Sequence, residues 1–209
     1  FFFFFQLFRF WSRSGYRPVV MSNTPNDQTG EMSIKMLLPV SAALERALPA
    51  ITPLFGTSFY RRLATCFRDL DPSLVVEILS SSPARSGSIW QASPLEASRL
   101  ENLATARKPV EEVARNYDMF NCLASAYFFG FLEGLHFSKS DEAALCAVGA
   151  QMMSLEEAAE RLGRGSKPGD RQNDVAARLR MVAKEISLHI GAIDIECLLT
   201  IAPREQVLL

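Results

Sequence analysis

The chain has 209 residues, of which 48% are hydrophobic and 22% charged, and its formal net charge at pH 7 is −1. That length is enough for one domain with its own hydrophobic core, and the composition excludes an intrinsically disordered chain. The balanced charge excludes a protein covered in basic side chains for nonspecific nucleic-acid binding, so an anionic partner would need a local patch.

Residues 1–30 differ in composition from the rest of the chain. Five phenylalanines open the sequence, three arginines follow, and no acidic residue precedes Asp27. This composition is typical of a segment that targets an organelle or touches a membrane surface, although an over-extended reading frame with its true start at Met21 would leave the same trace. We therefore predict an N-terminal leader and flexible linker at 1–30, which need not belong to the natural mature chain, and a single helical domain at 31–209.

Helix start signals and apolar residues at three- or four-residue spacing recur through the remainder of the chain. Asp71 with Pro72 is a typical helix start, and Ser154 with Glu157 has the pattern of a capping box. Together these signals predict helices at 40–48, 57–70, 72–79, 94–108, 138–152, 154–163 and 170–186, with a serine-rich loop at 80–93.

The longest stripe of apolar residues lies at 110–137. The predicted fold is therefore all-α, an irregular multi-helix bundle around a central long apolar helix at about residues 110–137. The second half of this helix is apolar on nearly all sides, but Asn121, Glu133 and His136 argue against a membrane span. The tail at 192–202 fits either a strand or a helix, and we expect a helix because no second strand is predicted to pair with it.

Cysteine and histidine supply few candidates for chemistry. The four cysteines are far apart among apolar neighbours, which predicts core residues in a cytoplasmic or other reducing intracellular compartment: Cys66, Cys122, Cys146 and Cys197. Glu133 and His136 form one Glu-x-x-His unit, whereas a carboxylate-bridged di-metal site needs two, so we interpret the pair as a structural contact. No phosphate loop or nucleophile motif is present. We predict no metal, no cofactor and no catalytic residue.

A basic region at 154–187 is the strongest local charge feature. Between Arg161 and Lys184 the sequence has seven basic residues and only two acidic ones, Asp170 and Asp174, a local excess of five positive charges. These seven residues are candidate contacts for an anion or a nucleic acid: Arg161, Arg164, Lys167, Arg171, Arg178, Arg180 and Lys184. The segment 154–163 with these cations resembles the opening helix of helix-turn-helix DNA-binding domains, although the six residues at 164–169 exceed the usual three- or four-residue turn.

Three functions are compatible with these features. The absence of catalytic signatures favours a non-enzymatic helical protein, an accessory or structural subunit that binds another protein or a second copy of itself. The alternative is a small helical DNA-binding regulator that uses 154–187, although the near-neutral charge makes nucleic acid the less favoured partner. A third is a helical enzyme with a dispersed site near Glu133 and His136. A membrane span is not expected, although the leader has the composition to touch a membrane surface.

Overall fold

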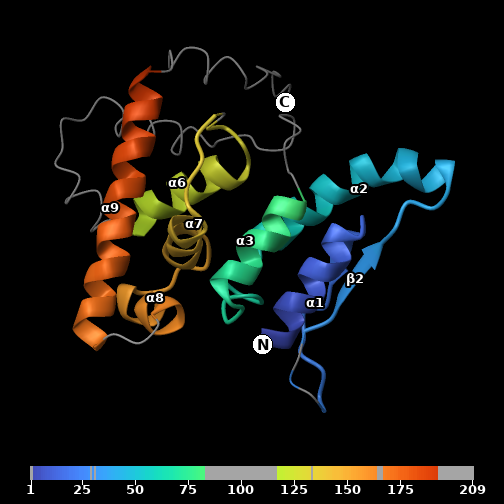
Figure 1. Ribbon diagram of the computed structural model, residues 1–209, viewed down its shortest axis with the longest axis horizontal. Coiled ribbons are helices and arrows are strands. Elements are labelled where there is room, and N and C mark those ends of the chain that lie inside the picture. The colour runs from blue at the N-terminus through green and yellow to red at the C-terminus, as the bar shows by residue number, and fades with distance from the viewer. Residues whose placement is uncertain are drawn as a thin grey trace, which may run out of the picture.

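The computed structural model describes residues 2–28, 30, 32–82, 117–132, 134–163 and 167–192, and within these the chain is mostly helical (Figure 1). In chain order the elements are α1 (Phe2–Arg13), β1 (Arg17–Met21), β2 (Ile34–Leu37), α2 (Ala42–Tyr60), α3 (Pro72–Ser81), α6 (Tyr117–Phe128), α7 (Lys139–Leu145), the π-helical turn η1 (Cys146–Ala150), α8 (Leu155–Leu162) and α9 (Pro168–Ala192). The prediction of a mostly helical fold is confirmed. The predicted loop at 80–93 and helix at 94–108 lie almost wholly outside the described residues, as does the tail beyond Ala192.

The first elements form a helix and a strand pair that the sequence patterns did not predict. β1 and β2 are antiparallel, with Arg17 opposite Leu37 and Met21 opposite Ile34. Phe8 on α1 and Met21 on β1 are 2% and 3% exposed and belong to the hydrophobic core. The division of the chain at residue 30 remains a prediction, but part of the expected leader packs against the helical body.

The helix boundaries predicted around residues 40–70 are wrong. Ser41 caps α2 by accepting a hydrogen bond from the Leu44 amide, and the helix then continues through Pro49 and Pro53 to Tyr60. A proline inside a helix removes one backbone hydrogen bond. Burial of the helix's second half offsets that loss, because the ring of Phe59 is fully buried. The next ten residues form turns rather than a helix.

The predicted central helix over 110–137 is not present as such. Residues 110–116 lie outside the described part, and the described helix α6 ends at Phe128. Two glycines follow in the left-handed region, Gly130 with φ 78° and Gly134 with φ 80°. Because other residues rarely adopt this conformation, the glycines favour a turn where spacing alone predicted a continuous helix.

In the described part of the chain, the helices from α6 onward pack against one another. Ser154 and Glu157 form the expected capping box at the start of α8. Along α9 the expected stripe is buried: Val175, Leu179, Val182 and Ile186. α6 packs closely on η1, where a Cβ added to Gly149 would lie 2.3 Å from the carbonyl oxygen of Phe120. This close approach requires glycine.

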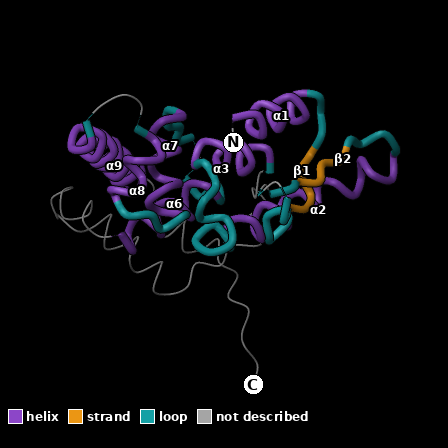
Figure 2. Tube along the Cα trace, turned by 90° about the horizontal axis from the view of Figure 1, so that it is seen from below, coloured by secondary structure: helices purple, strands orange, loops and turns teal. Residues whose placement is uncertain are grey.

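The N-terminal and C-terminal halves meet at the turns between α2 and α3 (Figure 2). The Gln151 side chain is fully buried, and its Nε2 lies 3.2, 3.1 and 2.9 Å from the carbonyl oxygens of Phe67, Arg68 and Leu70. A buried amide that satisfies backbone carbonyls across two segments fixes their relative position. Two ion pairs flank it, Arg68 with Glu157 at 2.7 Å and Arg161 with Asp69 at 2.9 Å.

Candidate functional site

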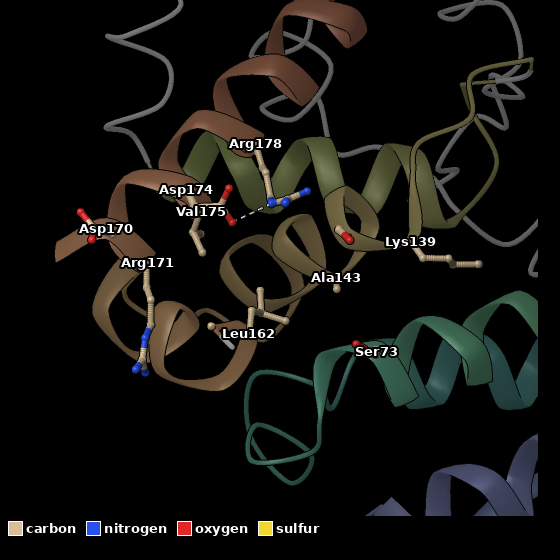
Figure 3. A pocket seen from close by; sticks show the side chains of 11 residues that line it. Ser73, Lys139, Ala143, Leu162, Asp170, Arg171, Asp174, Val175 and Arg178 are labelled. Carbon is tan, nitrogen blue, oxygen red and sulfur yellow. Dashed lines mark hydrogen bonds and ion pairs between the residues drawn. The ribbon is translucent and has the colours of Figure 1, made fainter. Parts of the chain in front are cut away.

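An open cleft of about 630 Å³ lies where α3, α7, α8 and α9 approach one another. Its apolar lining comes from Ala143, Leu162 and Val175. Figure 3 shows Arg178 extending from α9 toward α7, and Ser73 on α3 across the opening. The cleft therefore lies between the two halves of the molecule, and its lining contains both polar and apolar side chains.

Arg178 lines this cleft and is paired with two carboxylates. Its Nε lies 3.0 Å from a carboxylate oxygen of Asp174, and its Nη1 lies 3.2 Å from one of Asp141. The Asp141 carboxylate is nearly buried and also accepts a hydrogen bond from the Ser138 hydroxyl at 2.5 Å. Hydrogen bonding to Asp174, and then to Asp141, raises the pKa of Arg178, so this guanidinium is a fixed, paired charge.

Lys139 provides the cation on the α7 side of the cleft. Its ammonium lies 2.9 Å from a carboxylate oxygen of Glu142, whose other oxygen accepts a hydrogen bond of 2.6 Å from the Tyr127 hydroxyl. The Lys139 side chain is 62% exposed, so its ion pair is screened by water. The cleft thus carries compensated charges rather than a strongly positive field.

The seven predicted basic contacts do not gather in one patch. Arg161 is bound to Asp69, Arg178 is bound to two aspartates, and Arg171 lines the cleft. Arg180 and Lys184 are exposed and lie one turn apart on another side of α9, which we call its outer side. Among the described residues, neither has a carboxylate partner, and the exposed Lys167 has none either. Arg164 lies outside the described residues. The structure therefore separates the described cations: Arg171 and Arg178 line the cleft, Arg161 pairs with Asp69 outside it, and Arg180 and Lys184 lie on the outer side of α9.

The remaining candidates for chemistry are the histidine, glutamate and cysteine residues singled out in the sequence. His136 is exposed, while Glu133 lies outside the described residues, so their pairing stays a prediction. Cys146 is buried as predicted, and burial raises the pKa of its thiol, which makes it an unreactive core residue. The prediction that all the cysteines are core residues is wrong for Cys66, which is exposed. Among the described residues no group of three or more histidine, cysteine or acidic side chains is placed to hold a metal ion.

Comparison with known proteins relates this chain to acetyltransferases. The family GNAT acetyltransferase 2 matches residues 1–41, which contain α1, β1 and β2. The human RNA cytidine acetyltransferase is 29% identical over 165 residues, which cover 73% of this chain and 16% of that protein. The tRNA(Met) cytidine acetyltransferase TmcA of Thermofilum pendens is 31% identical over 80 residues, 38% of this chain and 10% of that protein. The chain therefore spans a small part of the length of the curated relatives it matches.

These similarities overturn the functional prediction made from the sequence. The relatives are named as acetyltransferases, so the prediction of a non-enzymatic, protein-binding helical subunit is wrong, and so is the prediction that the protein is not an enzyme. The names of these relatives refer to RNA or tRNA, which runs against the expectation that nucleic acid is the less favoured partner. No helix in the described part of the chain is long and apolar enough to cross a membrane.

The prediction of an all-α, non-enzymatic protein was wrong in part because β1 and β2 were not predicted. Pro18 to Met21 and Ile34 to Leu37 are short apolar runs that fit strands, but the first fell within the expected leader. Because residues 1–30 were predicted to be a leader, β1 was not predicted as a partner for β2, and these two are the strands of the described part of the chain. Recognising β1 and β2 as a strand pair would have argued against an all-α protein.

Proposed function

We propose that this chain is part of an RNA cytidine acetyltransferase, an enzyme that transfers an acetyl group to cytidine in RNA. The similarity to the human enzyme over 73% of the chain carries the proposal, because it extends well beyond the 41 residues matched by the acetyltransferase family. Similarity restricted to the acetyltransferase segment at 1–41 would not indicate which molecule accepts the acetyl group. The match to the human enzyme is longer and extends into the helical body.

The two regions of the chain then have separate roles. Residues 1–41, with α1, β1 and β2, belong to the part that carries out acetyl transfer. The helical body binds the RNA, and the outer side of α9 supplies phosphate contacts through Arg180 and Lys184. Both are exposed cations one helical turn apart, and phosphate contacts by such side chains provide most of the sequence-independent affinity for nucleic acid.

The other basic residues of this region are less suited to phosphate contacts than Arg180 and Lys184. Arg161 and Arg178 are already bound to carboxylates in the folded chain, so a phosphate would have to displace an existing partner. Lys167, the residue before α9, is exposed and adds a third cation next to this helix. RNA binding therefore depends on Arg180 and Lys184 more than on the cations that line the cleft.

Labelled acetyl transfer tests the proposal. A longer polypeptide of the relatives' length that carries residues 1–209 is incubated with RNA and an isotope-labelled acetyl thioester, and the nucleosides are then separated by mass spectrometry. We expect labelled acetylcytidine from RNA that contains cytidine and no labelled nucleoside from a matched RNA in which every cytidine is replaced. Folded, RNA-binding protein that yields no acetylcytidine would contradict the proposal.

A further inference from the structure

Helix α1 has apolar side chains on two opposite sides, and the described chain covers one of them. Phe8 is 2% exposed, and Phe5 is partly buried against the same core. On the other side Leu7, Phe10 and Trp11 are 42%, 59% and 37% exposed. Their spacing of three and four residues places all three on one face of the helix. We call Leu7, Phe10 and Trp11 the outer face of α1.

The inner side of α1 is held against the helical body. Arg9 forms a 2.8 Å ion pair with Glu77 on α3, and its guanidinium lies 4.7 Å from the centre of the Phe5 ring. Figure 1 shows α1 running beside α3. These contacts fix α1 to α3 and leave its outer face directed away from the body.

The outer face has the chemistry of a buried interface rather than of a solvated surface. The Trp11 ring packs edge-on against Phe10 at 5.1 Å and against Tyr16 at 4.8 Å, which gathers three aromatic rings. Val20 on the adjoining strand β1 is also 51% exposed. Clustered aromatic side chains on a surface mark a contact with another protein surface.

The strand pair beside α1 is also incomplete. β1 pairs with β2 alone among the described residues, and β2 is four residues long. A two-stranded sheet is marginally stable in water, and its open edges can pair with further strands. The outer face and the open strand edges occur together in the residues that match the acetyltransferase family, 1–41.

We propose that the outer face of α1 docks against the remaining acetyltransferase part of a longer polypeptide, so that α1 is held between that part and the RNA-binding helical body. The proposal rests on the proposed function for the identity of this occupant. The chain spans 16% of the human relative, so a protein of that kind has ample further chain to cover the face. Because the inner side of α1 is fixed to α3, α1 would set where the helical body lies relative to the site of acetyl transfer.

Hydroxyl-radical footprinting read by mass spectrometry tests this arrangement. Oxidation of Phe10 and Trp11 is compared between the 209-residue chain and the longer polypeptide that contains it. Met181, 45% exposed on the outer side of α9, is the internal control. We expect oxidation of Phe10 and Trp11 to fall severalfold in the longer polypeptide while that of Met181 stays the same. Unchanged oxidation of Phe10 and Trp11 would overturn the proposal.

Two further oxidation measurements distinguish this occupant of the outer face from a second copy of the chain. Protection of Phe10 in the 209-residue chain that grows with its concentration would show that a second copy covers the face, and would also overturn the proposal. In the longer polypeptide, Phe10→Asp should restore Trp11 oxidation to the level of the isolated chain. If acetylcytidine never forms but the protection is present, the proposed function fails and the interface stands.

Discussion

Helix α9 buries one apolar stripe and leaves Met181 and Leu188 exposed, whereas helix α1 buries Phe8 and leaves the three residues of its outer face exposed. The buried residues of α9 meet α7 and α8 within the same chain. The inner side of α1 meets α3, while Leu7, Phe10 and Trp11 remain exposed. Among the described residues, the C-terminal helices bury their main apolar stripes against one another, whereas α1 buries one side and leaves a cluster of apolar side chains exposed. This contrast underlies the two proposals, that α9 binds RNA and that the outer face of α1 contacts another part of a longer polypeptide.

The largest effect is expected from substitutions on the two sides of α1. Phe8→Ala should lower the free energy of unfolding of the chain by about 3 to 5 kcal/mol, because it leaves a cavity in the core. Phe10→Ala on the outer face should change it by less than about 0.5 kcal/mol, because the ring is already exposed. Urea unfolding followed by circular dichroism measures both. Where Phe8→Ala does not fold, Phe8→Leu serves in its place, and equal losses at positions 8 and 10 would contradict the two-sided description.

The junction between the two halves provides the next test. Gln151→Leu keeps the approximate side-chain volume but leaves the carbonyls of Phe67, Arg68 and Leu70 without their buried donor. We expect a loss of about 3 kcal/mol in the free energy of unfolding. Gln172→Leu on α9 is the matched control, with an expected change within about 0.5 kcal/mol. Equal stability of the two variants would show that Gln151 does not stabilise the junction between the halves.

RNA binding should depend on the outer side of α9. Reversing both charges with Arg180→Glu and Lys184→Glu should weaken RNA binding at low salt by about 10- to 100-fold. The slope of log affinity against log salt for single-stranded RNA should become shallower by about 1.4. Lys35→Glu with Arg46→Glu changes the net charge equally at exposed sites outside α9 and should leave binding nearly unchanged. Equal weakening by both pairs would show that only net charge matters.

The smallest effect concerns the pH dependence of the ion pair between Arg68 and Glu157. Hydrogen bonds from Arg68 and from the Ser154 backbone lower the pKa of Glu157 from 4.5 to about 2. Between these values the folded state binds fewer protons than the unfolded state, so the stabilisation is complete above pH 4.5 and declines toward pH 2. Acid titration of thermal unfolding should show a weaker pH dependence for Glu157→Gln than for the wild-type chain. Identical profiles would indicate that the pair contributes nothing measurable, which is common for exposed pairs.

Local signals predicted the C-terminal helices well. The capping box at Ser154 and the stripe from Val175 to Ile186 both specify structure through neighbours within one or two helical turns, and the structure confirms them. α2 was predicted too short because Pro49 and Pro53 are helix breakers by local propensity, whereas burial of Phe59 stabilises the longer helix. Tertiary packing outweighs propensity there.

The candidate site was less predictable than the fold. Local charge identified the basic residues of α9, but their ion pairs depend on partners far away in sequence, such as Asp69 for Arg161 and Asp141 for Arg178. Nothing in local spacing distinguishes these from Arg180 and Lys184. The helix and strand of the N-terminal segment were not predicted because its composition, rich in phenylalanine and arginine and without acidic residues before Asp27, is also typical of a targeting segment.

The most direct test of the account measures acetylcytidine formation against RNA concentration for the longer polypeptide and for its Arg180→Glu, Lys184→Glu variant. We predict that the wild-type protein forms acetylcytidine. The variant should have a KM for RNA raised by about tenfold or more with little change in kcat, because its losses are in phosphate contacts that do not touch the reacting cytidine. Absence of acetylcytidine from the wild-type protein, or an unchanged KM in the variant, would contradict the assignment of acetyl transfer and RNA binding made here.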